Sequence, residues 1–248
     1  MIKSFFKWVG LSALTAYYVI SGLLRVPFGT AGGYYRKISG KYGKQALAIA
    51  GGKAAWEGLD NLNPKECYLF VGNHQSYADI FLLFAALYSR GMRTLFMLKK
   101  ELFKMPLFGL MAKYMGLIPI EREESRKALK TVLNAIKTMA EGNSLTIFPE
   151  GSRTKDGKFL PFKRGAFVIA ERTKMPIVPF AIVGAADIMP SNNMSIRAGS
   201  CHISFLPPIA PGDMPSRELA FKVESAIREE HELIALFLKT EQNGNKKL

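Results

Sequence analysis

The chain has 248 residues, 48% of them hydrophobic, and its 34 Lys and Arg against 20 Asp and Glu give a formal net charge of +14. The length and hydrophobic content are enough for one substantial α/β core, and no repeat or linker divides the chain into two domains. Its three histidines and two cysteines are scattered without metal-ligand spacing, which argues against a metal site, and we expect no other cofactor.

Residues 1–56 differ from the rest of the chain in charge. They contain no acidic residue and carry eight basic ones, namely Lys3, Lys7, Arg25, Arg36, Lys37, Lys41, Lys44 and Lys53. Residues 8–24 have no charge, and as a helix they would be about 26 Å long, slightly less than the ~30 Å hydrocarbon core of a bilayer. Basic, apolar and aromatic residues together predict a segment that attaches to anionic membrane lipids, whether it spans the bilayer or lies in one leaflet.

A signal peptide and a nucleic-acid-binding segment fit residues 1–56 less well. Lys3 and Lys7 before an apolar stretch resemble a signal peptide, but no small-x-small cleavage site follows. Cys67 and Cys201, far apart in predicted strands, are typical of buried thiols in a reducing compartment. A basic protein can also bind nucleic acid, but no stacking-aromatic motif of a nucleic-acid module is present. We therefore expect the cytoplasmic face of a cell inner membrane, with membrane lipids and no nucleic acid as partners.

A histidine and an aspartate lie five residues apart, directly after a predicted strand. Residues 67–71 read as a buried strand, Gly72-Asn73 as a turn, and the apolar run from Asp79 onward as a helix. On one continuous helix the two side chains would point in different directions, so they can meet only if His74 precedes the helix and Asp79 lies in its first turn. Such a pair predicts a general base with a carboxylate that orients it. A histidine that caps the helix or satisfies a buried polar group is the structural alternative.

Two further predicted strands are followed by basic residues. Residues 93–98 are followed by Lys99 and Lys100, and residues 116–122 end at Arg122. Ligands of open α/β sheets bind where strands end, so Lys100 and Arg122 are candidates for binding a phosphate. Arg122 lies among three glutamates, and a solvated helix start explains it equally well.

The polar stretch Glu150-Gly151-Ser152-Arg153 follows another buried strand, predicted over residues 144–148. Gly151 allows a ligand to approach the backbone closely, and the planar guanidinium of Arg153 fits phosphate oxygens. Lys163 stands before a helix predicted over residues 166–172, whose N-terminus also attracts anions. A basic, solvated loop with a Glu150–Arg153 ion pair is the structural alternative.

Residues 151–159 are similar to a nucleotide-binding P-loop but do not fit it. The second glycine is one place late, and Lys158 is followed by Phe159 where Ser or Thr is required. We therefore reject a nucleoside triphosphate as ligand.

The remaining segments complete the predicted fold. Residues 201–206 read as a strand, and residues 216–239 as a helix. These elements predict an α/β domain over residues 57–240, with a central mixed, largely parallel sheet flanked by helices. The membrane segment of residues 1–56 precedes this domain, and a disordered tail at residues 241–248 follows it. His202 and His231 are interpreted as structural or solvated.

Four blocks in this region resemble those of the glycerolipid acyltransferases. Residues 73–79, Asn-His-Gln-Ser-Tyr-Ala-Asp, resemble the His-x4-Asp block of that family. Residues 116–122, 148–154 and 177–182 resemble its second, third and fourth blocks, in the family's order. Within the family, the chain is most similar to the bacterial enzymes that acylate 1-acyl-sn-glycerol 3-phosphate.

The resemblance implies that an acyl group passes from a thioester of coenzyme A or of a carrier protein to the sn-2 hydroxyl of lysophosphatidic acid, which gives phosphatidic acid. His74 would take the proton of that hydroxyl, and Asp79 would hold the imidazole. The acceptor phosphate would be bound by Lys100, Arg122, Glu150, Gly151, Ser152 and Arg153. Because the nucleophile belongs to the substrate, Ser76, which has no nucleophile-elbow glycines around it, need not be acylated.

Two apolar helical stretches, residues 80–88 and 102–115, could wall a groove for the acyl chain or simply face the core. Two alternative functions stay open. One is acylation of a different lysolipid, and the other is a membrane protein that binds anionic lipid without turnover.

Overall fold

The computed structural model describes residues 2–105, 108–120, 135–137, 143–154 and 158–244. Within them, seven strands form one sheet in the order β1-β7-β6-β2-β5-β3-β4. Neighbouring strands are parallel except for β6 and β7, which are antiparallel, and this confirms the predicted mixed, largely parallel sheet. The strands are β1 (Gly52–Glu57), β2 (Leu69–Gly72), β3 (Thr94–Lys99), β4 (Ile118–Ile120), β5 (Ser144–Ile147), β6 (Ile177–Val183) and β7 (Gly199–Phe205).

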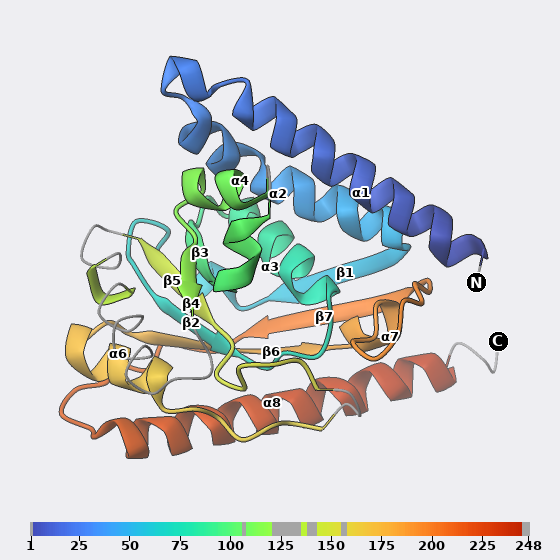
Figure 1. The fold of residues 1–248 in the computed structure, drawn as a ribbon. Helices are drawn as coiled ribbons and strands as arrows, with labels where there is room; N and C mark the ends of the chain where they lie inside the picture. Colours follow the sequence, from blue (N-terminus) through green and yellow to red (C-terminus); the bar gives the residue numbers. More distant parts are fainter. Residues whose placement is uncertain (1, 106–107, 121–134, 138–142, 155–157, 245–248) are drawn as a thin grey trace.

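Helices cover both faces of the sheet (Figure 1). One face carries α1 (Ile2–Leu23), α2 (Ala31–Ala50), α3 (Ala78–Ser89) and α4 (Phe108–Tyr114), and the other carries α6 (Gly165–Thr173) and α8 (Ser216–Gly244). The short elements in the connections are η1 (Val26–Phe28), η2 (Leu59–Asn61), η3 (Lys100–Lys104) and α7 (Ala185–Ile188). This confirms helices on both sides of the sheet, as expected for the predicted α/β class.

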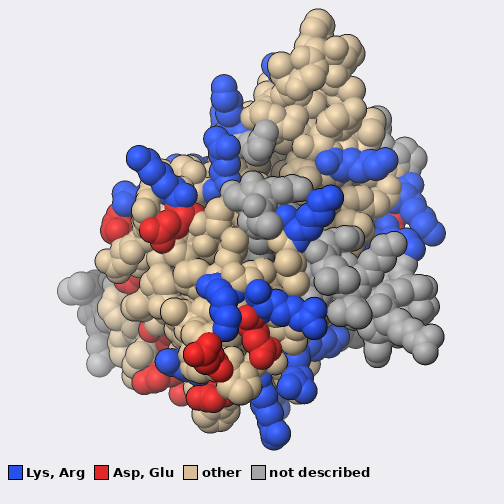
Figure 2. Space-filling model, turned by 90° about the vertical axis from the view of Figure 1, so that its left-hand side faces the viewer, with Lys and Arg blue, Asp and Glu red and all other residues tan. Residues whose placement is uncertain are grey.

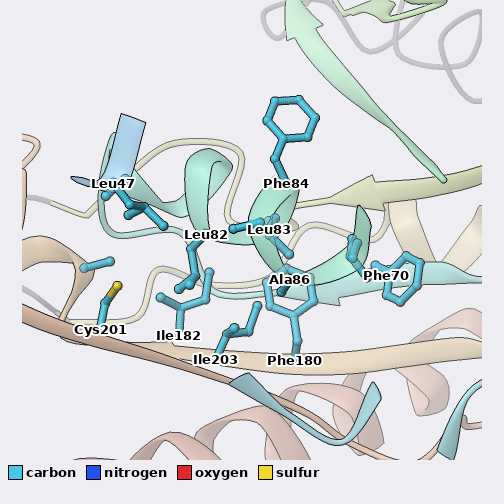
Figure 3. Close-up of a cluster of buried hydrophobic side chains, with 14 of the residues drawn as sticks. Leu47, Phe70, Leu82, Leu83, Phe84, Ala86, Phe180, Ile182, Cys201 and Ile203 are labelled. Atoms are coloured by element: carbon cyan, nitrogen blue, oxygen red, sulfur yellow. The ribbon is translucent and has the colours of Figure 1, made fainter. Parts of the chain in front are cut away.

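Two hydrophobic clusters hold these layers together. Between the sheet and α3, the side chains of Phe70, Leu82, Phe180 and Ile203 are buried against one another (Figure 3). The cluster on the other face joins the sheet to α6 and α8. Burying one large apolar side chain contributes about 1.5–3 kcal/mol. The strand and helix on either side of the His74 loop, β2 and α3, are therefore firmly anchored.

The N-terminal helices pack closely on the α/β domain. A Cβ atom added at Gly43 of α2 would lie 2.5 Å from the carbonyl oxygen of Phe81 in α3, and one added at Gly40 would lie 2.8 Å from Cβ of Tyr88. These glycines let the two helix backbones approach to a distance that larger residues would prevent. α1 in turn packs along α2, where Gly22 makes room for the buried ring of Tyr35.

The predicted domain boundaries differ from the observed elements at both ends. β1 pairs with β7 from Gly52↔Gly199 to Glu57↔Ser204, so the boundary expected between residues 56 and 57 cuts a strand of the sheet. The hydrophobic signal of β1 is weak because it is an edge strand with alternate residues exposed. At the other end, α8 continues to Gly244, past residue 240, and residues 245–248 lie outside the described part. Of the two free thiols, Cys201 is buried in β7, whereas Cys67 is half-buried ahead of β2.

Candidate active site

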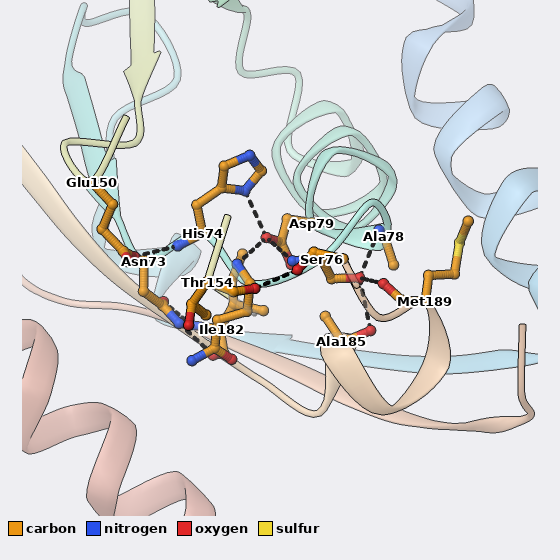
Figure 4. Close-up of polar contacts among 12 residues, drawn as sticks. Asn73, His74, Ser76, Ala78, Asp79, Glu150, Thr154, Ile182, Ala185 and Met189 are labelled. Carbon is orange, nitrogen blue, oxygen red and sulfur yellow. Dashed lines mark hydrogen bonds and ion pairs between the residues drawn. The ribbon is translucent and has the colours of Figure 1, made fainter. Parts of the chain in front are cut away.

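The loop between β2 and α3 carries His74, and Asp79 lies fully buried in the first turn of α3. Oδ2 of Asp79 is 2.8 Å from Nδ1 of His74, and it also accepts the backbone N–H groups of Gln75 and Ser76 at 2.8 and 2.9 Å (Figure 4). An oxygen that accepts three N–H groups places the proton of the neutral imidazole on Nδ1, which leaves the lone pair of Nε2 free to take a proton. The structure therefore brings the two side chains together as their spacing predicts.

The imidazole of His74 is also held from one side by an aromatic ring. The rings of His74 and Phe148 are stacked, with centroids 4.0 Å apart and an interplanar angle of 16°. Phe148 follows β5, and its own ring packs edge-on against Phe180 of β6. With the hydrogen bond at Nδ1 and the stacked ring on its face, the imidazole is restricted to one orientation.

Glu150 joins two loops of the site. Its Oε1 accepts the backbone N–H of His74 at 2.7 Å, its Oε2 accepts that of Leu160 at 2.9 Å, and the residue is only 2% exposed. Burial raises the pKa of this carboxyl above its ordinary value, and the two backbone N–H donors oppose that effect. Among the described residues it forms no ion pair with Arg153, so the ion pair considered from sequence is not found there. Glu150 thus positions the loops, and the expectation that it contacts a ligand phosphate is not supported by this geometry.

Gly151 and Arg153 lie in the loop after β5. Gly151 has φ +73°, a left-handed conformation that favours glycine, and an added Cβ would lie 2.8 Å from Nζ of Lys163. Ser152 is exposed. Cζ of Arg153 lies 3.6 Å from the centre of the Tyr77 ring, and its guanidinium makes no hydrogen bond or ion pair with any described residue. Arg153 is therefore a half-buried cation with N–H groups available to an anion.

A cavity of about 600 Å³ has both His74 and Arg153 in its wall. Most of the remaining wall is apolar, and it includes both helical stretches proposed from sequence, through residues such as Ile80, Phe81, Phe84, Leu102, Phe108, Met111 and Met115. The N-terminal helices contribute further side chains, which sequence reasoning missed, among them Tyr18, Tyr35, Ile38 and Tyr42. The site thus combines an imidazole, a cation and a hydrophobic space large enough for an alkyl chain.

Comparison with known families agrees with this geometry. The family model described as Acyltransferase matches residues 53–183, which is just over half of the chain and contains the described parts of all four blocks. The chain belongs to this acyltransferase family. The match begins in β1 and ends in β6, so it covers His74, Asp79 and the Arg153 loop but not α1 or α2.

Several proteins named 1-acyl-sn-glycerol-3-phosphate acyltransferase are similar to this acyltransferase. A chloroplastic protein of Brassica napus is 36% identical over 56% of the chain and 40% of its own length, and a Cocos nucifera protein is 32% identical over 73% and 58%. The human alpha protein is 29% identical over 75% of the chain and 64% of its own length. The chain thus spans about two fifths of the Brassica relative. The crystal structure of the Thermotoga maritima 1-acyl-sn-glycerophosphate acyltransferase matches with a TM-score of 0.81 and 24% identity, over 94% of this chain and 95% of that one.

The other predicted phosphate-binding residues of the acyltransferase are placed differently. Lys100 begins η3 and is exposed, and the neighbouring Lys99, at the end of β3, is the lysine in the cavity wall. Successive residues at a strand end point in opposite directions, so Lys99 and not Lys100 lines the cavity, although both lysines are exposed. A phosphate-binding role for Lys100 stays a prediction. Arg122 lies outside the described residues.

Asn73 and Ser76 are positioning residues of the acyltransferase site that sequence reasoning did not assign. The Asn73 side chain donates to the carbonyl oxygen of Ile182 at 2.8 Å and accepts the N–H of the same residue at 2.7 Å. The Ser76 hydroxyl lies 2.8 and 2.7 Å from the carbonyl oxygens of Ala185 and Met189 (Figure 4). Both side chains tie the His74 loop to β6 and α7. This use of the Ser76 hydroxyl agrees with its not being expected as a nucleophile.

His231 of α8 also reaches this loop. Its Nε2 lies 3.4 Å from Nε2 of Gln75, and its ring packs edge-on against Phe159. Burial lowers the pKa of His231 below its ordinary 6.5, and the Glu232 carboxylate acts in the opposite direction. As the pH falls through about 6.5, the unfolded chain therefore takes up a proton at this site before the folded chain does. The free energy of unfolding decreases as the pH decreases.

We expect His231→Gln to reduce this loss of stability between about pH 7.5 and about pH 5.5. Urea unfolding at the two pH values measures it, with His202→Gln as the matched histidine variant. An equal pH dependence in wild type and His231→Gln would show that His231 does not contribute.

Proposed function

We propose that the chain transfers a fatty acyl group from an acyl thioester to the sn-2 hydroxyl of 1-acyl-sn-glycerol 3-phosphate, giving phosphatidic acid and a free thiol. The observation that carries this proposal is one cavity wall that holds both Nε2 of His74 and the guanidinium of Arg153, neither of which has a hydrogen-bond or ion-pair partner among the described residues. A base and a cation on one wall fit an acceptor that has both a hydroxyl and a phosphate. The names of the similar proteins support the same acceptor.

In the proposed reaction, Nε2 of His74 removes the hydroxyl proton as the acceptor oxygen attacks the thioester carbonyl carbon. The buried Asp79 carboxylate stabilises the imidazolium that forms and does not itself take the proton. When the tetrahedral intermediate collapses, the C–S bond breaks and the leaving thiolate receives the proton from Nε2. The acceptor supplies the nucleophile, so the transfer needs no acylated residue of the chain.

The cavity accounts for the other parts of the substrates. The guanidinium of Arg153 would bind phosphate oxygens through two parallel N–H donors, a charge-assisted contact. The apolar wall formed by α3, α4 and the N-terminal helices would hold an alkyl chain. In this proposal Lys99 replaces Lys100 as the lysine nearest the substrates, and Arg122 keeps its expected role as a second phosphate ligand.

We also propose that α1 and α2 attach the protein to a membrane. Among the described residues, α1 with η1 is the one segment long and apolar enough to cross a bilayer. Only 22% of its apolar 18-residue stretch is buried in the protein. Large exposed side chains run along it, namely Ile2, Phe5, Phe6, Val9, Tyr17, Ile20, Leu24 and Phe28. Figure 2 shows no acidic side chain on the lobe at the top of the view, which these helices form. An apolar face this large is typical of membrane contact.

The contacts of α1 favour a position along the membrane surface. Nζ of Lys7 donates to the carbonyl oxygen of Ala50 at 2.7 Å, and Nε1 of Trp8 donates to that of Met194 at 2.8 Å. A helix seated on its own domain in this way would enter one leaflet with its free face. The free thiols fit a reducing compartment, so we place the domain on the cytoplasmic face of a cell inner membrane.

The acyl-transfer proposal is tested with a panel of acceptors. The purified protein in detergent is given a radiolabelled acyl thioester of coenzyme A or of acyl carrier protein, with lysophosphatidic acid, a lysophospholipid of larger head group, or monoacylglycerol. Labelled phosphatidic acid should be the main product. Faster labelling of another lysolipid would change the acceptor, and lipid binding without transfer would establish a binding protein.

The membrane proposal predicts an effect of the exposed lysines of α2. Changing Lys37, Lys41 and Lys44 to Gln should weaken binding to anionic vesicles at low salt about tenfold to hundredfold, since each lysine near an anionic surface contributes about 1 kcal/mol. Vesicle co-sedimentation measures this. The matched control changes Arg217, Lys222 and Lys239 of α8, on the opposite face of the sheet, to Gln. Equal binding by both triple variants would leave the apolar face of α1 as the attachment.

A further inference from the structure

Tyr77 directly precedes α3 and contacts Arg153, the candidate phosphate-binding arginine. At 3.6 Å from the ring centre, Cζ of Arg153 is in van der Waals contact with the face of the Tyr77 ring. A guanidinium this close must lie nearly flat on the ring, so its N–H groups point outward around the ring edge. Both residues line the cavity together with His74. The ring therefore occupies one face of the guanidinium and leaves its hydrogen-bond donors to a ligand.

The Tyr77 ring is itself held by the N-terminal helix. It is half-buried, and Trp8 of α1 packs against it edge to face, with ring centroids 5.9 Å apart and an interplanar angle of 86°. The indole N–H of Trp8 is fixed by its hydrogen bond to the carbonyl oxygen of Met194. The backbone of Tyr77 is fixed as well, because the preceding Ser76 is bonded to α7. Trp8, Tyr77 and Arg153 thus form one continuous series of contacts, in which the guanidinium is stacked on the Tyr77 ring and the indole meets that ring edge to face.

The same turn of α1 also carries exposed aromatic side chains. Phe5 and Phe6 are 65% and 66% exposed, whereas Trp8 is half-buried against Tyr77. Ser4 also bonds to the chain at Ile196, with its Oγ accepting that N–H at 3.0 Å. Whatever orients this turn of α1 therefore also orients the indole that supports Tyr77.

We propose that Tyr77 is a positioning residue for Arg153, and that Trp8 extends this support to the membrane-attaching helix. The inference deepens the proposed function, because it rests on Arg153 as the ligand of the acceptor phosphate. A free arginine side chain loses rotamer freedom when it binds an anion. The stack restricts the side chain before the acceptor arrives, so its removal weakens acceptor binding and leaves the His74–Asp79 pair unchanged.

The test measures equilibrium binding of lysophosphatidic acid in detergent micelles, without thioester, by isothermal titration calorimetry. Tyr77→Leu should raise the Kd about threefold to thirtyfold, the range of a cation–π contact, and Tyr77→Met should do the same. Tyr77→Phe keeps the ring face and should keep the wild-type Kd. In the Arg153→Ala background, Tyr77→Leu should add less than about twofold, because its effect passes through Arg153. An unchanged Kd in folded Tyr77→Leu or Tyr77→Met, or a full extra loss in the double variant, would overturn the proposal.

The extension to α1 has its own matched pair of variants. Trp8→Leu should raise the same Kd at least about threefold, while Phe6→Leu, which removes an outward ring from the same helix turn, should not change it. Equal Kd values for these two variants would show that Trp8 does not support Tyr77. Because the readout is binding, failure of the proposed function shows separately, as a wild-type protein that binds lysophosphatidic acid without acylating it.

Discussion

His74→Ala should lower the rate of acyl transfer by about a thousandfold or more, with the protein still folded and bound to membranes. The variant removes the group whose Nε2 would accept the hydroxyl proton, and general-base catalysis with its orienting carboxylate accounts for orders of magnitude in rate. Asp79→Asn should lose most of the activity too. An amide oxygen can still accept the N–H groups of Gln75 and Ser76, but it has no charge to stabilise the imidazolium.

Initial rates with labelled thioester and lysophosphatidic acid measure both variants. His202→Ala is the matched control, because His202 pairs with Glu57 at 2.9 Å on β1 and β7 and is not in the cavity wall. Near-normal turnover in His74→Ala, with folding verified by circular dichroism, would remove the proposed mechanism.

Arg153→Ala should raise the KM for lysophosphatidic acid about tenfold to hundredfold and leave the KM for the thioester within about twofold. A hydrogen bond to a charged group contributes about 1.5–3 kcal/mol. Among the described residues, the guanidinium of Arg153 has no hydrogen-bond acceptor that would compete with the phosphate. Arg122→Ala is expected to act in the same way, as the place of Arg122 at the end of the second block implies.

The control for this effect is Arg90→Ala, which removes an exposed arginine paired with Asp60 at 2.7 Å after α3. Kinetics with monoacylglycerol, which has no phosphate, give the second comparison. If Arg153→Ala slowed the neutral acceptor as much as the phosphorylated one, Arg153 would support the loop and the phosphate site would lie elsewhere.

The local part of the site could be predicted from sequence. The spacing of His74 and Asp79, between a buried strand and an apolar helix, permits a contact only in a strand-loop-helix arrangement, and β2 and α3 have that arrangement. The choice between Lys99 and Lys100 could not be made in this way. A shift of one residue at the end of a strand moves a side chain to the other face, and composition does not define the end of β3 that precisely.

Contacts between distant segments could not be predicted either. Asn73 pairs with the backbone of Ile182, 109 positions away, and Glu150 accepts backbone N–H groups from two loops. Such bonds depend on the order of strands in the sheet, which one sequence does not reveal. The N-terminal helices are a similar case. Their charge and hydropathy predict a membrane segment but not their packing on the α/β domain. The close packing at Gly40 and Gly43, and the side chains of α2 in the cavity wall, show that α2 is also part of the cavity-bearing domain.

In the proposed mechanism, the acyl group passes from the thioester to the acceptor hydroxyl without an acylated residue of the protein. A single-turnover experiment with a radiolabelled acyl thioester tests this step most directly. Protein in excess over thioester is mixed with saturating lysophosphatidic acid, or with no acceptor, and the label in protein and lipid is followed in time. We predict that label passes to phosphatidic acid with no labelled protein at any time, and that without acceptor the protein stays unlabelled. Stable labelling of the protein, followed by transfer of that label to the acceptor, would contradict His74 as the base that activates the acceptor hydroxyl directly.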